Sequence, residues 1–195
     1  MDIHTSEARR RTRETIRRTM SADLAAALRA RERMGPAAVE QAAGLIAALA
    51  SIKETIENQA RALGYTQRCR QAIEVCGGEC CIWHFPKTIT AADFFIAVFD
   101  LAENETAVLV DQVRETPGEP AYQCPLLRKD GCIFDFQHRP LVCTAAFPCM
   151  AGQQFWYTKE RLRTEIETLR AALGRLIFDR PGGRAPQPGQ KKRTP

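Results

Sequence analysis

All eight cysteines of this 195-residue chain lie between positions 69 and 149. They fall into two groups of four, which are Cys69, Cys76, Cys80 and Cys81, and then Cys124, Cys132, Cys143 and Cys149. Thiolates are preferred ligands of zinc and of the iron in iron–sulfur clusters. A centre held by two separated segments ties those segments together. The spacing therefore predicts a metal or cluster site as the organising element of this part of the chain.

The remaining composition is that of a helical protein. Hydrophobic residues make up 45% of the chain but aromatic residues only 7%, so much of the apolar material is the Ala, Leu and Ile of helices. The length suits one compact domain with an appendage. We predict a mainly α fold, in which a helical hairpin and a C-terminal helix surround a small cysteine-rich metal-binding core with a short β-hairpin.

Two features favour a cytoplasmic protein with reduced thiols. The first residues are polar and charged with no apolar stretch behind them, which argues against a secretory signal. No apolar run approaches the roughly 20 residues that cross a bilayer, so no membrane partner is expected. Because cytoplasmic thiols are kept reduced, the cysteines are better interpreted as ligands than as disulfides.

The formal charge of +5 is concentrated at the two ends of the chain. Residues 1–33 carry nine Arg against five acidic residues, and residues 179–195 carry five Lys or Arg against one Asp, which gives +4 at each end and −3 between them. A nucleic-acid-binding domain is more uniformly basic, so this pattern argues against such a partner. A protein partner at the N-terminal helical region remains open.

The first 68 residues are predicted to form the basic helical hairpin. Residues 6–34 read as an Arg-rich helix, broken or capped near Ser21, and Gly35-Pro36 stops it. A second helix is expected to reach about Leu63, because its apolar residues return every three or four positions and form one stripe. The stripe consists of Val39, Ala42, Leu45, Ile46, Leu49, Ile52, Ile56, Ala60 and Leu63. We interpret it as packing surface.

Four further elements are predicted after the first cysteine group. Thr90 and Asp93 have the form of a capping box that starts a short helix, and a second helical segment spans residues 105–113. Asp130-Gly131 between apolar arms predicts a β-hairpin carrying Cys124 and Cys132. An amphipathic helix over residues 158–178, within the segment 151–178, packs on the core. Residues 179–195, rich in Pro, Gly and basic side chains, are predicted to be a disordered tail.

The first cysteine group has the local sequence of a ligand loop. In Cys76-Gly-Gly-Glu-Cys80-Cys81 the two glycines allow the backbone to wrap so that Cys76 and Cys80 face one point. Cys81 points to the other side of an extended chain, which indicates a multinuclear cluster, two centres or one spectator. If the chain from Cys69 to Cys76 is helical, its two ends lie about 10 Å apart, so Cys69 stays undecided as a ligand.

In the second group, proline precedes two of the thiols and restricts the backbone. Arg139-Pro140 precedes Cys143, and Phe147-Pro148 precedes Cys149. Arg139 is a candidate hydrogen-bond donor to cluster or ligand sulfurs, with pairing to a surface carboxylate as the alternative. The predicted metal ligands, which lie in a domain of residues 69–150, are Cys76, Cys80, Cys81, Cys124, Cys132, Cys143 and Cys149.

Other chemistry has weaker support. His84 and His138 lie near the cysteines and are alternative nitrogen ligands. Glu79 and Asp135 add acid–base groups, but none of these residues has a distinctive catalytic spacing. No phosphate-binding glycine loop or zinc-protease signature occurs in the sequence. Whether the protein is an enzyme therefore stays open.

The cysteine segments resemble the cysteine-cluster family of zinc- or iron-chelating proteins, known by its CxxCxxCC pattern and as the YkgJ type. In CPLLRKDGCIFDFQHRPLVC, the residues Cys124, Cys132, Arg139-Pro140 and Cys143 follow the family's order, and CGGECC resembles the end of its first motif. Three residues rather than two separate Cys76 from Cys80, and the family's leading cysteine would fall near Ile73. The resemblance covers residues 69–150 and implies binding of a metal or an iron–sulfur cluster.

These observations favour one function and leave two alternatives. The favoured function is a cytoplasmic metal-binding protein whose cysteines hold an iron–sulfur cluster or zinc. The second is a metal-dependent or redox modifying enzyme, which would need an open coordination position. The third is a redox or metal sensor that binds a partner through its basic N-terminus.

Overall fold

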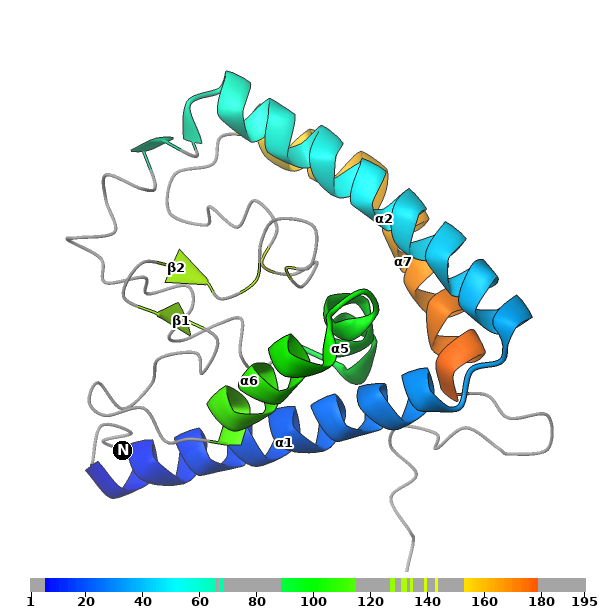
Figure 1. The fold of residues 1–195 in the computed structure, drawn as a ribbon. Coiled ribbons are helices and arrows are strands. Elements are labelled where there is room, and N and C mark those ends of the chain that lie inside the picture. The colour runs from blue at the N-terminus through cyan, green and yellow to red at the C-terminus, as the bar shows by residue number, and fades with distance from the viewer. Residues whose placement is uncertain are drawn as a thin grey trace, which may run out of the picture.

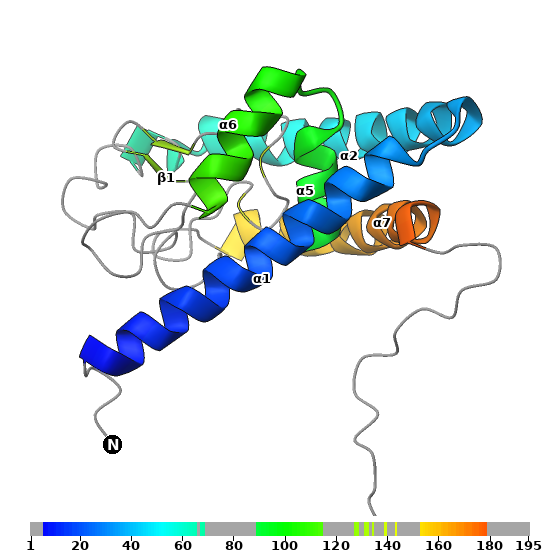
Figure 2. The same ribbon diagram turned by 60° about the horizontal axis from the view of Figure 1, so that its bottom comes forward.

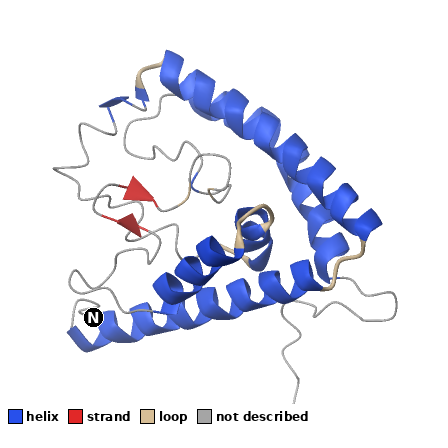
Figure 3. Cartoon of the chain, in the orientation of Figure 1, coloured by secondary structure: helices blue, strands red, loops and turns tan. Residues whose placement is uncertain are grey.

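The computed structural model describes residues 6–65, 67–68, 89–114, 127–128, 131–132, 134, 139, 143 and 153–178. The elements in these residues are α1 (Ser6–Glu32), α2 (Pro36–Ala62), α5 (Ala91–Val98), α6 (Glu103–Arg114), β1 (Leu127–Arg128), β2 (Gly131–Cys132) and α7 (Gln153–Phe178). Helices therefore dominate the described chain, as Figure 3 shows, and the prediction of a mainly α fold is confirmed.

The helices α1 and α2 diverge from the turn that joins them, like the two sides of a V (Figure 1). The short helices α5 and α6 occupy the angle, while α7 runs alongside α2 (Figures 1 and 2). The most extensive helix contacts are those of α1 with α5 and of α2 with α7. The predicted pairing of the first two helices as a hairpin is therefore wrong. Their apolar faces are buried, but each faces a helix from farther along the chain.

Helix α1 continues through Ser21, where the sequence predicts a break or a cap. Met20, Leu24 and Ala27 are at most 3% exposed and belong to the main core. Since these three residues recur at helical spacing on both sides of Ser21, their packing holds the helix continuous there. The stop at Gly35-Pro36 is confirmed, because α1 ends at Glu32 and Pro36 is the first residue of α2.

Helix α5 is the centre of the core. Phe94, Phe95 and the three following residues are all at most 3% exposed, so this helix is surrounded by the rest of the fold. Its C-terminal end is held by α1, because the Arg31 guanidinium donates hydrogen bonds to the carbonyl oxygens of Val98 and, at 3.2 Å, of Leu101. A cation at a helix C-terminus also complements the helix dipole.

Helix α2 buries its apolar stripe mainly against α7. Leu49, Ile56 and Ala60 are at most 2% exposed, as predicted, whereas Val39 in the first turn is 41% exposed and lies outside the packed face. The helix ends where Gly64 takes a positive φ of 73° and donates its N–H to the Arg61 carbonyl. The partner helix α7 begins at Gln153, five residues before the predicted start at Thr158.

A buried carboxylate joins α5 to α7. Asp93, in the first turn of α5, accepts a hydrogen bond from the Thr90 backbone N–H at 3.0 Å and one from the Thr90 hydroxyl at 2.8 Å. The predicted pairing of Thr90 with Asp93 at this helix start is therefore confirmed. Arg170 of α7 forms an ion pair with the same Asp93 oxygen, at 3.0 Å, and the Asp93 side chain is fully buried. Burial, together with the negative charge of Asp93, raises the pKa of Asp23 on α1.

Replacing Asp23 by Asn should stabilise the protein at neutral pH. The folded state holds the Asp23 proton more tightly than the unfolded chain does, so stability falls as pH rises from the unfolded pKa through the raised folded pKa. The Asp23→Asn variant has no carboxyl group at this position, so its stability does not fall with rising pH for this reason. We expect a gain of about 0.5 kcal/mol at pH 7, kept small because solvent screens a partly exposed carboxyl. Urea unfolding at pH 7 and below pH 4 measures it, and an equal gain at both pH values would contradict the assignment.

Among the described residues, no helix has the length and apolarity needed to cross a membrane. The predicted basic tail, residues 179–195, lies outside the described residues, as does most of the predicted cysteine domain, residues 69–150.

Candidate metal centre

Cys132 is held in a small antiparallel ladder. Strand β2 pairs with β1, and the partners are Leu127 with Cys132 and Arg128 with Gly131. The ladder lies toward the open side of the V, away from the turn between α1 and α2 (Figure 1). These strands lie where the sequence predicts a hairpin. Its turn residues 129–130 and its other cysteine, Cys124, lie outside the described residues.

The residues that follow Cys132 make two attachments to the helices. Phe134 is 5% exposed and belongs to the main hydrophobic core. Arg139 is partly buried, and its carbonyl oxygen accepts a hydrogen bond from Lys53 of α2 at 2.7 Å. Cys143, four residues later, is also partly buried. The helical scaffold therefore holds the second cysteine segment at Phe134 and at Arg139, the first residue of the predicted Arg139-Pro140 turn.

Lys53 is the residue that the sequence interpretation missed. Its side chain is among the largest that are fully buried, at 1% exposure, although lysine is almost never buried without a partner. One signal could have found it. Lys53 lies seven residues after Ile46 and seven before Ala60, so it occupies a position within the apolar stripe of the helix. A charged residue at such a position indicates a buried polar contact.

Arg139 carries a buried donor atom with no acceptor in the described part of the chain. Its Nε is shielded from solvent, and none of the described residues accepts a hydrogen bond from it. Buried N–H groups are almost always satisfied, because leaving one unpaired costs about 1–3 kcal/mol. This is the side chain that the sequence predicts as a donor to ligand or cluster sulfurs.

Charged residues gather where α2 meets this segment. Lys53 and Arg139 each carry one positive charge, and Glu57, which is 8% exposed, carries one negative charge one helical turn after Lys53. Arg61 donates to Glu57 at 3.4 Å. A group of thiolates around a zinc ion or an iron–sulfur cluster is anionic, so such a centre would complement this face. Soft sulfur ligands also match both of these metals.

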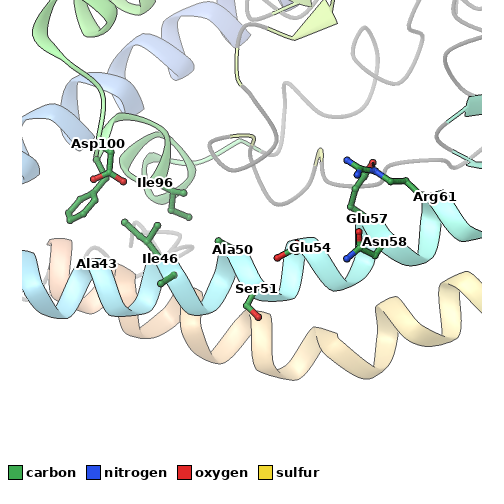
Figure 4. Close-up of a pocket in the computed structure, with 12 residues that line it drawn as sticks. Ala43, Ile46, Ala50, Ser51, Glu54, Glu57, Asn58, Arg61, Ile96 and Asp100 are labelled. Carbon is green, nitrogen blue, oxygen red and sulfur yellow. Dashed lines mark hydrogen bonds and ion pairs between the residues drawn. The ribbon is translucent and has the colours of Figure 1, made fainter.

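A groove runs along the neighbouring face of α2 and reaches the same region. It encloses about 530 Å³ between α2 and the end of α5. Ile46 and Ile96 lie at one end of the groove, near Asp100, and Glu57 and Arg61 lie at the other end (Figure 4). Glu57 is one helical turn from Lys53. The end of the groove at Glu57 and Arg61 is therefore about one turn along α2 from the contact between Lys53 and Arg139.

Only two of the predicted ligands lie within the described residues. These are Cys132, in β2, and Cys143. The remaining candidates lie outside the described residues. These candidates are Cys69, Cys76, Cys80, Cys81, Cys124, Cys149, His84, His138, Glu79 and Asp135. Within the described ranges alone, no group of three or more His, Cys, Asp or Glu side chains could hold a metal ion. The predicted ligand set therefore stays a prediction.

Comparisons with known protein families, with curated proteins and with solved structures find no match to this chain. The resemblance of the cysteine segments to the cysteine-cluster family accordingly remains a prediction from the quoted motifs.

Proposed function

We propose that this protein is a metal-binding protein whose clustered cysteines hold an iron–sulfur cluster or zinc. The observation that carries the proposal is the buried Arg139 Nε, which has no acceptor among the described residues and belongs to the cysteine segment. In the sequence, this side chain is a candidate hydrogen-bond donor to ligand or cluster sulfurs. A sulfur ligand of a bound metal would supply the acceptor that a buried donor requires.

The chemistry of the candidate ligands supports the same function. All eight cysteines are concentrated between positions 69 and 149, beside Gly and Pro residues that favour turns. The would-be ligands are Cys76, Cys80, Cys81, Cys124, Cys132, Cys143 and Cys149. The described scaffold contributes the ladder that holds Cys132 and the anchored segment that leads to Cys143. A metal bound there would crosslink the two cysteine segments.

Single replacements of cysteine by serine test this function. Cys132→Ser and Cys143→Ser each remove one soft ligand, so we expect at least about a tenfold loss of metal affinity and substoichiometric metal after purification. Cys69→Ser is the matched comparison, because it makes the same chemical change at a cysteine outside the predicted ligand set. Elemental analysis of the three proteins, purified under anaerobic conditions, gives the metal content. Wild-type metal content in both Cys132→Ser and Cys143→Ser would contradict the proposal.

The metal identity is decided on the same samples. The adjacent pair Cys80-Cys81 and the excess of thiols over the four that one tetrahedral ion requires favour an iron–sulfur cluster. Iron with acid-labile sulfide and a brown colour would establish the cluster, whereas a colourless protein with stoichiometric zinc would establish a zinc site. Either result agrees with the proposed function.

A further inference from the structure

We propose that Lys53 is the positioning residue through which the helical scaffold orients and charges the cysteine centre. This inference rests on the proposed function. It adds a role for a residue of α2 that lies outside the cysteine motifs, 16 positions before Cys69 and 90 before Cys143. Lys53 would act on the centre through Arg139 and through its own electric field.

Lys53 contacts the cysteine segment directly. The Lys53 ammonium, 1% exposed, donates to the Arg139 carbonyl oxygen at 2.7 Å. A charge-assisted bond of this length in a buried setting fixes the backbone that it contacts. The fixed residue is the one whose Nε lacks an acceptor in the described chain. Lys53 therefore sets the position from which Arg139 can reach a sulfur.

Lys53 also brings a positive charge to this segment. The Lys53 ammonium contacts the backbone carbonyl of Arg139, whose side chain carries a second positive charge, and charges in a poorly solvated place act strongly on one another. Glu57 offsets part of this charge, but it is also bonded to Arg61. An anionic thiolate centre next to Arg139 would stabilise both cations. The same attraction would stabilise the bound metal, since outer residues of this kind typically change metal affinity by about 10- to 100-fold.

Three replacements separate the charge of Lys53 from its hydrogen bond. Lys53→Arg keeps the charge and the donor, Lys53→Gln keeps a donor without the charge, and Lys53→Met removes both while retaining much of the apolar stem. Arg29→Met is the matched control, because it removes one positive charge from an exposed position on α1. Circular dichroism of each metal-free protein first establishes that it folds.

The probe is Co²⁺, whose sulfur-to-metal absorption reports thiolate ligation, titrated anaerobically into each reduced, metal-free full-length protein. We expect Lys53→Gln and Lys53→Met to weaken Co²⁺ binding by about 10- to 100-fold. Lys53→Arg and Arg29→Met should stay within about threefold of the wild type, because neither changes the charge beside Arg139. If Lys53→Arg does not fold, the comparison of Lys53→Gln and Lys53→Met with the wild type decides whether the charge of Lys53 affects Co²⁺ binding.

Two outcomes overturn the inference while the proposed function stands. Wild-type affinity in Lys53→Met would show that the residue does not act on the centre. Wild-type affinity in Lys53→Gln, with a loss only in Lys53→Met, would show that a neutral donor suffices and that the charge has no role. By contrast, a wild-type protein that shows no thiolate absorption with Co²⁺ and carries no metal on purification would overturn the proposed function itself.

Discussion

Replacing Phe95 by alanine is expected to destabilise the protein by about 3–5 kcal/mol. Phe95 is fully buried in α5, the helix that packs against α1 and α7, and its ring lies 5.6 Å from that of Phe99. Truncation removes its buried apolar surface and leaves a cavity at the centre of the core, which the surrounding helices can close only in part. Urea unfolding followed by circular dichroism measures the loss.

Phe178→Ala provides the matched control for this replacement. Phe178 is the last residue of α7 and is 42% exposed, so the same chemical change leaves no enclosed cavity. We expect a loss below about 1 kcal/mol. Equal losses in the two variants would show that α5 is not the centre of the core.

Replacing Arg170 by methionine is expected to cost about 3 kcal/mol. The change leaves the fully buried Asp93 carboxylate without the guanidinium that contacts it at 3.0 Å. Removing one partner of a buried pair typically costs about 3–5 kcal/mol, because the other charge stays buried. The lower value applies here, since the Arg170 side chain is 32% exposed and Thr90 still donates to Asp93.

Arg163→Met, on the same helix, is the control. It tests whether removing any arginine from α7 destabilises the protein as much as removing Arg170. Arg163 contacts Glu160 at 3.1 Å and Glu167 at 2.8 Å, but both acidic side chains are more than 60% exposed. Exposed pairs of this kind contribute little, so stability should be almost unchanged. A double-mutant cycle of Asp93→Asn with Arg170→Met then isolates the coupling of the buried pair. A coupling energy near zero would show that the ion pair of Asp93 and Arg170 does not stabilise the contact between α5 and α7.

Local sequence signals predicted the helices well, because they depend on residues close together in the chain. Gly35-Pro36 separates α1 from α2, and Thr90 with Asp93 marks the start of α5. The partners of the helices could not be predicted this way. A stripe such as Leu49, Ile56 and Ala60 shows that one face is buried but carries no information about what covers it. For that reason the order of the helices in the sequence suggests a hairpin of α1 and α2, whereas α2 packs on α7.

The chemistry of the candidate site stays a prediction from the sequence, whereas its attachment to the scaffold is seen only in the structure. The motifs around Cys132, Arg139 and Cys143 predict a metal site, because residue type and short spacing determine which ligand atoms a segment can offer. The contact between Lys53 and Arg139 joins residues 86 positions apart, and no local pattern specifies such a pair. Likewise, the capping role of Asp93 was visible in the sequence, whereas its ion pair with Arg170 was not.

The metal content of the anaerobically purified wild-type protein tests the account most directly. Elemental analysis and sulfide determination, combined with circular dichroism before and after chelation, give both the occupancy and its effect on folding. We expect stoichiometric iron with sulfide, or stoichiometric zinc, and a loss of thermal stability when the metal is removed. A fully folded protein that contains neither metal and is unaffected by the chelator would contradict the account.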